Sequence, residues 1–155
     1  MKEAVRIVAS ILLFAATAVF MEFMDWTTHK YIMHGFLWVL HRDHHRPASH
    51  GLQRNDLFAL FFAAISITLI LVGLNRGWTP LYASGFGMAL YGMGYIAFHD
   101  LLFHRRIRAI SYHPRSTYMK RIFRAHRAHH RNPRKHGGTS FSFLYAPKTD
   151  GPRQP

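Results

Sequence analysis

The sequence contains no cysteine and few acidic residues. Without cysteine the chain forms no disulfide, iron–sulfur cluster, thiolate-ligated haem or cysteine zinc site, so any metal must be bound by other side chains. Only 7 acidic residues oppose 20 lysines and arginines, which gives a formal net charge of +13. A chain of 155 residues is also too short for a two-domain enzyme. The composition therefore describes one basic domain without thiol chemistry.

Charge is also scarce in three apolar stretches, residues 7–24, 57–74 and 78–98, each long enough to cross most of a bilayer core. Residues 75–77 form a short polar connection between the second and third stretches, which predicts a helical hairpin. Residues 25–56 and 99–155 then lie on the same face of the membrane. We expect an all-α integral membrane bundle of about three to four spans with a histidine-rich helical cap. Four glycines of the third stretch allow close helix packing or are ordinary filler: Gly85, Gly87, Gly92 and Gly94.

The basic residues gather near the C-terminus. Residues 104–155 hold 13 of the 20 lysines and arginines and one of the 7 acids. By the positive-inside rule this face is cytoplasmic. A secretory signal peptide at the start of the chain is the alternative suggested by Lys2, Arg6 and the Ala-Thr-Ala triplet at 16–18. Nucleic-acid binding is disfavoured because the basic segment adjoins an apolar stretch and no nucleic-acid module is recognisable.

What the chain has in excess is histidine. Ten of its 13 histidines fall into four motifs, two of the form HX4H and two of the form HX2HH. Four matched spacings are far more specific than an isolated histidine pair. The HX4H pairs are His29 with His34 and His99 with His104, and the HX2HH sets are His41, His44 and His45 and then His126, His129 and His130.

Helical geometry indicates which of these imidazoles can share an ion. On a continuous α-helix His41 and His45 lie on one stripe, and His34 falls within about 20° of His41. His29 lies about 140° from His34, so that pair suits a helix end or two separate metals. Ten imidazoles exceed the ligands of one tetrahedral or octahedral ion, which predicts two metal ions.

Acidic residues beside the motifs are candidates for orienting the imidazoles. Asp43 and Asp100 adjoin motif histidines, and Asp25 and Asp56 lie nearby, although all four also suit surface charges or helix caps. A histidine-rich, thiol-free metal site at a bilayer surface favours oxygen chemistry on a lipid-soluble substrate, namely hydroxylation or desaturation. Three histidines outside the motifs are expected to be solvated: His50, His113 and His136.

At these residues the sequence resembles the membrane histidine-motif oxygenases of the fatty acid hydroxylase superfamily and, within it, the bacterial β-carotene 3-hydroxylases. The similarity covers nearly the whole chain. It runs through MEFMDWTTHKYIMHGFLWVLHRDHH, NDLFALFFAAISI, YGMGYIAFHDLLFH, YMKRIFRAHRAHH and GTSFSFLYAP.

The resemblance implies O2-dependent hydroxylation at C3 of each β-ionone ring, from β-carotene through β-cryptoxanthin to zeaxanthin. It implies a non-haem di-iron centre, electrons from reduced ferredoxin or a similar carrier, and a bacterial inner-membrane location with the active site facing the cytoplasm. Keto-carotenoids are accepted by some members of the family. The implied iron ligands are His29, His34, His41, His44, His45, His99, His104, His126, His129 and His130.

Other interpretations remain open. A fatty-acid or sterol hydroxylase or desaturase needs the same histidines, and a membrane metal-binding or transport protein would use them as carriers. The C-terminal arginines suit an acidic ferredoxin or anionic lipid. We expect one hydroxylase domain over residues 1–146, with histidine segments at 29–45 and 99–130, followed by a flexible tail at 147–155.

Overall fold

The computed structural model describes residues 1–46, 51–107 and 109–147, and these residues form helices and loops without a strand. The expected all-α architecture is therefore confirmed. His50 and the expected tail from residue 148 onward lie outside the described residues. The helices are α1 (Lys2–Thr27), η1 (Thr28–Phe36), α2 (Trp38–His41), α3 (Asp56–Asn75), α4 (Thr79–Tyr95), η2 (Ile96–Phe103) and α5 (Thr117–His130).

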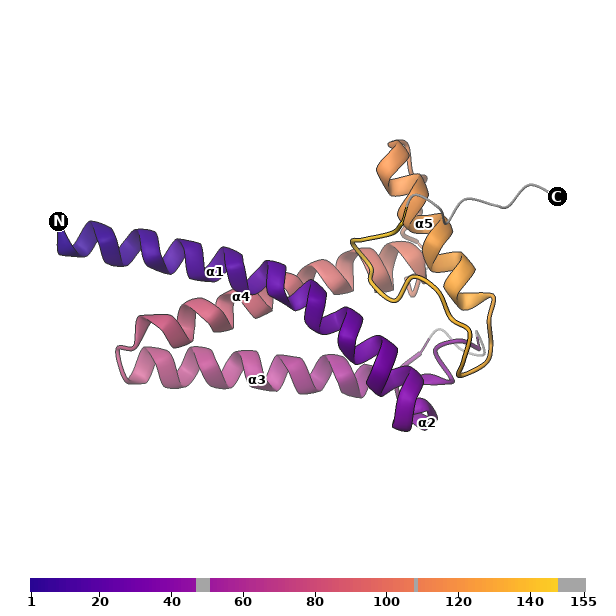
Figure 1. The fold of residues 1–155 in the computed structure, drawn as a ribbon, viewed down its shortest axis with the longest axis horizontal. Coiled ribbons are helices and arrows are strands. Elements are labelled where there is room, and N and C mark those ends of the chain that lie inside the picture. Colours follow the sequence, from indigo (N-terminus) through magenta and orange to yellow (C-terminus); the bar gives the residue numbers. More distant parts are fainter. Residues whose placement is uncertain (47–50, 108, 148–155) are drawn as a thin grey trace.

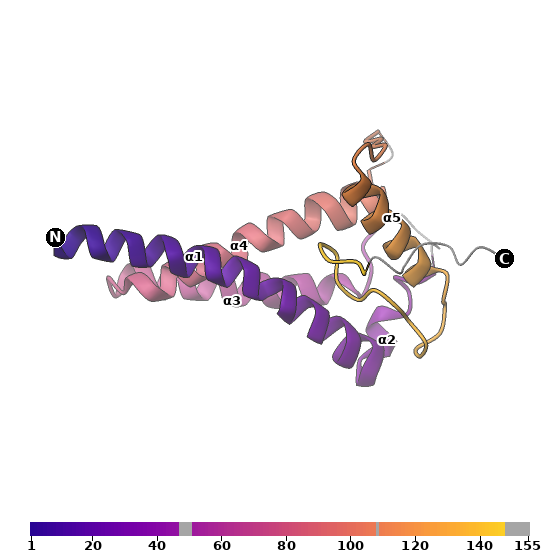
Figure 2. The ribbon, with the colours of Figure 1, turned by 45° about the horizontal axis from the view of Figure 1, so that its top comes forward.

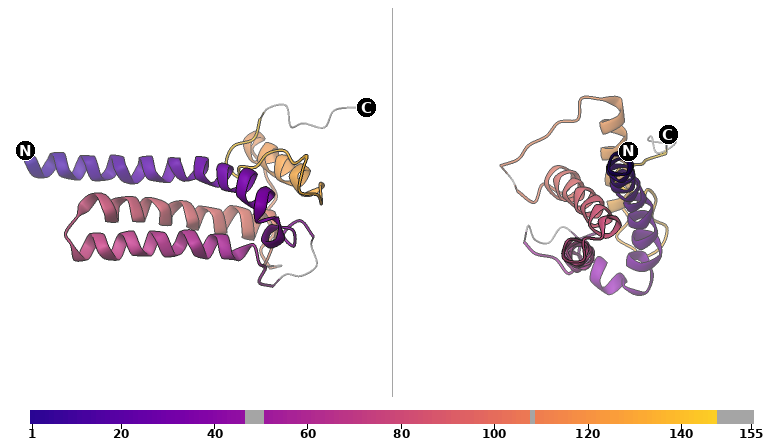
Figure 3. Two further views of the ribbon diagram at one scale, coloured as in Figure 1. Left: turned by 60° about the horizontal axis from the view of Figure 1, so that its bottom comes forward. Right: turned by 90° about the vertical axis from the view of Figure 1, so that its left-hand side faces the viewer.

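The molecule is elongated, with α1, α3 and α4 running side by side along its length (Figure 1; Figure 3, left). The N-terminus and the turn between α3 and α4 lie at one end. At the other end lie α2, α5 and the loop that follows α5, as the turned view also shows (Figure 2). The expected convergence of the two histidine segments at one end of the bundle is thus observed.

Two helices are long and apolar enough to cross a membrane. They are Lys2–Phe36, which joins α1 to η1, and α3. Both present large apolar side chains outward, for example Val19 at 76% exposure and Leu60 at 63%. The third expected span, 78–98, forms α4 and the start of η2, and α4, at 17 residues, is shorter than α1 and α3. Together with the apolar outer surface, the two long helices indicate a membrane protein.

Glycines set the spacing of the three long helices. A Cβ on Gly85 would lie 2.7 Å from Ile70 Cγ1 of α3, and the Ser66 hydroxyl donates to the Gly85 carbonyl at 2.7 Å. A Cβ on Gly87 would lie 2.5 Å from a backbone carbonyl of α1. The expected close approach therefore holds for Gly85 and Gly87. Around Gly92 and Gly94, nearer the histidines, nothing lies within 4 Å of an added Cβ.

A loop at residues 131–147, which we call the C-terminal strap, folds back from α5 over the end of the bundle (Figure 1). Phe143 anchors it and is only 2% exposed, packed with Met21 of α1 and Tyr91 of α4. Glu22 of α1 holds it by hydrogen bonds, since one carboxylate oxygen accepts the backbone N–H groups of Leu144 and Tyr145, each at 3.0 Å. The other carboxylate oxygen accepts the Tyr91 hydroxyl at 2.8 Å. The strap is therefore fixed to two of the long helices.

Candidate metal centre

The ten motif histidines form two groups at the end of the bundle. In the five rings of one group, and in four rings of the other, the potential ligand atoms all lie within 4.8 Å of one another. His126 adjoins these four rings, because its Nε2 lies 2.9 Å from His104 Nε2. The first cluster is His29, His34, His41, His45 and His129, and the second cluster is His44, His99, His104, His130 and the adjoining His126.

The clusters do not divide the histidines by chain segment. The sequence pattern suggests five ligands from residues 29–45 and five from residues 99–130. In the structure His129 joins the first cluster and His44 joins the second. The two groups also abut, since the rings of His45 and His130 stack with centroids 4.6 Å apart. Each group thus combines the N-terminal and C-terminal segments.

The HX4H pairs depend on a local change of helix type. The angular argument from a continuous α-helix separates His29 from His34, yet both lie in the first cluster with ring centroids 5.2 Å apart. The reason is that η1 is a π-helix, whose wider turn brings residues i and i+5 to one face. His99 and His104 are joined in the same way in η2, where the His104 N–H donates to the His99 carbonyl at 3.0 Å. The expectation for these pairs was therefore wrong, although His41 and His45 do share a stripe.

A break near the end of η1 returns the chain toward α1. Gly35 leaves the helical region at φ −101° and ψ −126°. The short helix α2 then places His41, which is 1% exposed, against His29. Trp38 packs on the His34 ring at 5.0 Å and closes the outer side. The kink therefore gathers four histidines of one segment into a single group.

Within each cluster the Nε2 atoms point at one another. His41 Nε2 lies 3.1 Å from both His29 Nε2 and His45 Nε2. His34 Nε2 lies 3.2 Å from His129 Nε2. Two nitrogens that bind one ion at about 2.1 Å lie roughly 3.0–3.4 Å apart. The observed separations match two ligands of one metal.

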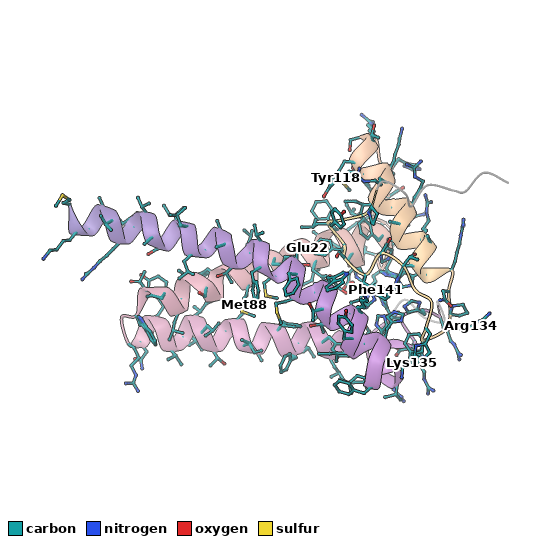
Figure 4. All side chains as sticks on the ribbon, viewed as in Figure 1. Glu22, Met88, Tyr118, Arg134, Lys135 and Phe141 are labelled. Carbon is teal, nitrogen blue, oxygen red and sulfur yellow. The ribbon has the colours of Figure 1, made fainter. Side chains whose placement is uncertain are left out.

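The outer Nδ1 atoms of the first cluster are held mainly by backbone of the strap. Four of these rings donate their Nδ1–H to strap carbonyls, and the fifth donates to the side chain of Asn55. The acceptors are the Phe141 carbonyl for His29 at 2.7 Å, Lys135 for His34 at 2.8 Å, Asn132 for His45 at 3.0 Å, Thr139 for His129 at 2.6 Å and Asn55 Oδ1 for His41 at 2.6 Å. Figure 4 labels Phe141 and Lys135 on the strap where it crosses the bundle.

The second cluster uses side-chain acceptors. His44 Nδ1 donates to Gln53 Oε1 at 3.0 Å, and His99 Nδ1 donates to Asp100 Oδ1 at 2.8 Å. Arg106 lies 3.8 Å from the other Asp100 oxygen and pairs with Asp56 at 2.6 Å. The second cluster therefore has a carboxylate on one imidazole, whereas the acceptors of the first cluster are all neutral.

These outer bonds decide what the inner nitrogens can bind. A carbonyl or carboxylate oxygen only accepts, so each of the seven bonded rings carries its proton on Nδ1 and an unshared pair on Nε2. Two Nε2 lone pairs that face each other at 3.1 Å repel, because neither nitrogen has a proton to donate. His130 Nε2 is also buried with no hydrogen-bond partner among the described residues. Converging nitrogen lone pairs without donors are what a bound cation satisfies.

Burial keeps the rings neutral, which a metal ligand requires. Removal from water lowers the pKa of His41 to about 2 and that of His129 to about 3. It also lowers the pKa values of His45 and His104 to about 4. At pH 7 the lone pairs are therefore free to bind a metal.

The acidic candidates separate into different roles. Asp100 holds His99 as expected, and burial raises its pKa to about 6, against the opposing effect of Arg106. Asp43 instead accepts the backbone N–H of Arg54 at 3.0 Å. Asp56 accepts the N–H of Gln53 at 2.9 Å and pairs with Arg106, so it fixes the loop that carries Gln53. Asp25 lines the cavities beside the clusters.

Four contributors were missed in the sequence. Gln53 and Asn55 carry no motif signal, and the strap carbonyls are backbone atoms that every residue has. Glu22 offered a usable signal, because an acid inside an otherwise uncharged membrane stretch is a functional candidate by default. His113 and His136 lie outside both clusters and are exposed, as expected.

Comparison with known proteins finds one matching family model and several similar sequences. The family model described as Fatty acid hydroxylase matches residues 14–147. The β-carotene hydroxylase of Pantoea ananas is 47% identical, over 84% of this chain and 74% of the relative. The β-carotene hydroxylase of a Paracoccus species is 40% identical, over 92% of this chain and 88% of the relative. The chloroplastic β-carotene 3-hydroxylase 2 of Arabidopsis thaliana is 33% identical over 84% of this chain and 43% of the relative. No solved structure matches.

Proposed function

The chain belongs to the fatty acid hydroxylase family, and on that premise we propose that it hydroxylates β-carotene. Oxygen enters at C3 of each β-ionone ring, which gives β-cryptoxanthin and then zeaxanthin. One observation carries the proposal: two abutting histidine clusters, with converging Nε2 lone pairs, in a chain similar to β-carotene hydroxylases.

The two clusters suit a pair of non-haem iron ions, one in each, with the ten motif histidines as ligands. When bound, such a pair supplies the activation of O2 that side chains alone cannot provide. The residues of the chain perform the remaining tasks. The inner nitrogens hold the ions, the Nδ1 bonds fix the rings, and Phe141 packs edge-on against His29 at 5.5 Å and excludes water.

The rival functions are less well supported. A fatty-acid or sterol hydroxylase shares the family, but the three relatives compared with this chain are named for β-carotene. A metal transporter needs ionisable groups along its spans, but α3 carries no charged residue after Asp56, and the acids Glu22 and Asp25 of α1 lie only in its last two turns, beside the histidines. Its histidines would also have to release the ion, whereas seven of these rings are locked by outer hydrogen bonds.

A reduced ferredoxin or similar carrier is the proposed electron donor. Helix α5 buries His126 and His129 on one face and exposes Arg124 and Arg127 on the other. An acidic carrier attracted to these arginines would dock one helix diameter from the ligands, at about 10 Å. By the positive-inside rule the same basic end faces the cytoplasm of a bacterial inner membrane.

Product analysis in cells that accumulate β-carotene tests the activity. The unaltered chain should yield β-cryptoxanthin and zeaxanthin, and His129→Ala should yield neither product. The control, His113→Ala, changes an exposed histidine outside the clusters and should give the same products as the unaltered chain. All three proteins should be present in the membrane fraction. Purified protein should hold two irons per chain.

Each rival predicts a different result. Hydroxylated fatty acids or sterols without hydroxylated carotenoid would reject the substrate. Bound metal without O2-dependent turnover would favour the transporter. Full activity of His129→Ala would remove that ring from the ligand set.

A further inference from the structure

An apolar cavity of about 280 Å³ lies beneath the histidines, between α1, α3 and α4. Its walls include Phe58 and Phe62 of α3 and Met88 of α4. Figure 4 labels Met88 between α1 and the hairpin. The cavity exists because α3 and α4 touch at Ser66 and Gly85 and then diverge toward the histidine end (Figures 1 and 2).

The head of this cavity opens onto the metal centre. Asp25, Met33 and Tyr95 line it and also line a second, small cavity whose other walls include four of the motif histidines. Tyr95 stacks on the His99 ring at 4.3 Å. A molecule whose end reaches the head of the cavity is therefore next to the ligand groups of both clusters.

One side of the cavity opens to the outer surface of the bundle. Met21, Met33 and Tyr91 on the α1 side are buried. On the opposite side Ile67 of α3 is 55% exposed and Met93 of α4 is 62% exposed. In a membrane this side faces lipid, so an apolar molecule can enter laterally between α3 and α4 without passing through water.

The dimensions decide how much of a carotenoid fits. From Asp56 to Ile67 the cavity follows α3 for roughly 17 Å, at about 1.5 Å per residue. Pockets that enclose a whole drug-sized ligand measure roughly 300–1,000 Å³, so this one cannot enclose a forty-carbon carotenoid. The conjugated chain is rigid and cannot fold back on itself. The contact of Ser66 with Gly85 closes the path deeper into the hairpin.

We propose that this cavity is a substrate slot that holds one half of the carotenoid. One ring lies at the head of the slot beside Asp25 and Tyr95, and the adjoining polyene runs past Gly92 and Ala63. The other half leaves between α3 and α4 into the lipid. This inference rests on the proposed function and extends it. Each binding event then hydroxylates one ring, and the product must leave the slot and bind again in the opposite orientation before the second ring can be hydroxylated.

Two matched pairs of variants test the slot. A Cβ at Gly92 meets nothing within 4 Å, so Gly92→Phe fills the slot without a backbone clash, and Gly94→Phe adds the same ring at an equally open position outside it. On α3, Ala63→Phe enters the slot, whereas the neighbouring Ala64→Phe faces elsewhere. The pair from α3 keeps the test valid if a change in α4 impairs folding.

The measured quantity is β-carotene retained per chain after purification without O2, together with the iron content. Gly92→Phe and Ala63→Phe should retain at least tenfold less β-carotene than the unaltered chain, with unchanged iron, and the two controls should match the unaltered chain. Normal retention by both slot variants, or an equal loss in the controls, would overturn the slot.

A chase experiment tests the single-ring event. Labelled β-carotene is bound first, and O2 and reduced ferredoxin are then added together with a large excess of unlabelled β-carotene. The label should stop at β-cryptoxanthin, and label reaching zeaxanthin at the rate seen without the chase would overturn the inference. If the unaltered chain makes no hydroxylated carotenoid at all, the proposed function fails first, so the two failures are distinguishable.

Discussion

Replacement of Glu22 by alanine should loosen the first cluster from a distance. The Glu22 carboxylate touches no motif histidine in the described hydrogen bonds; it holds Leu144 and Tyr145 of the strap and the hydroxyl of Tyr91. The strap in turn supplies the carbonyls that fix four of the five rings of that cluster. Removing the carboxylate therefore removes the hydrogen bonds that hold the strap to α1, while all ten histidines remain in the chain.

The expected size follows from the hydrogen bonds. Two of these bonds, the backbone N–H groups of Leu144 and Tyr145 on the carboxylate, hold the strap, and at about 1.5 kcal/mol each they stabilise the docked strap by about 3 kcal/mol. Because 1.4 kcal/mol corresponds to a factor of ten, their loss raises the open fraction of the strap on the order of 100-fold. Loss of the outer partners of metal-bound histidines typically lowers metal affinity 10- to 100-fold. The second cluster, held by Gln53 and Asp100, should keep its ion.

Amide hydrogen exchange and chelator competition measure the two effects. In Glu22→Ala the amides of Leu144 and Tyr145 should exchange on the order of 100-fold faster, and one of two irons should be lost to a chelator first. Glu3→Ala, at the exposed start of the same helix, is the control and should change neither. If Glu22→Ala keeps both its amide protection and its two irons, the strap is not held in the way described.

Three further predictions concern the site and the helix packing. Asp100→Asn weakens the acceptor on His99 and should lower iron affinity about 10- to 100-fold, measured by chelator titration; unchanged affinity would exclude that role. The pKa values of His41 and His129 are about 2 and 3 in the folded protein, below the unfolded value of 6.5. The metal-free fold should therefore lose stability as the pH falls below 6.5, by about 1.4 kcal/mol per pH unit for each ring. An unfolding temperature that does not change between pH 7.5 and 5.5 would contradict this. Gly87→Leu should destabilise the contact of α4 with α1 by about 1–3 kcal/mol because its Cβ would meet a carbonyl at 2.5 Å, and unchanged thermal stability in detergent would refute that contact.

Much of the architecture was predictable because it depends on patterns of residue type. Uncharged runs predict the long helices, and the short polar turn at 75–77 predicts the hairpin that brings both histidine segments to one end. The motif spacings also identify all ten histidines that form the two clusters, including His126, which adjoins His104. These features follow from chain order and hydrophobicity alone.

The arrangement inside the site was not predictable in the same way. The angular separation of about 140° between His29 and His34 applies to an α-helix, and no residue in the HX4H motif indicates a π-helix. The exchange of His44 and His129 between clusters depends on how α5 crosses the bundle. Asp43 and Asp100 both adjoin motif histidines, yet only Asp100 hydrogen-bonds one, because the direction of a side chain depends on tertiary contacts.

The mixed composition of the two clusters has a consequence for biosynthesis. Neither histidine cluster is complete until α5 has been translated, because His129 and His130 come from the last turn of α5. By then the residues of α1, α3 and α4 have already been synthesised. On the proposed function, metal loading is therefore a late event in maturation, and each ion that binds would link α5 to the segment of η1 and α2.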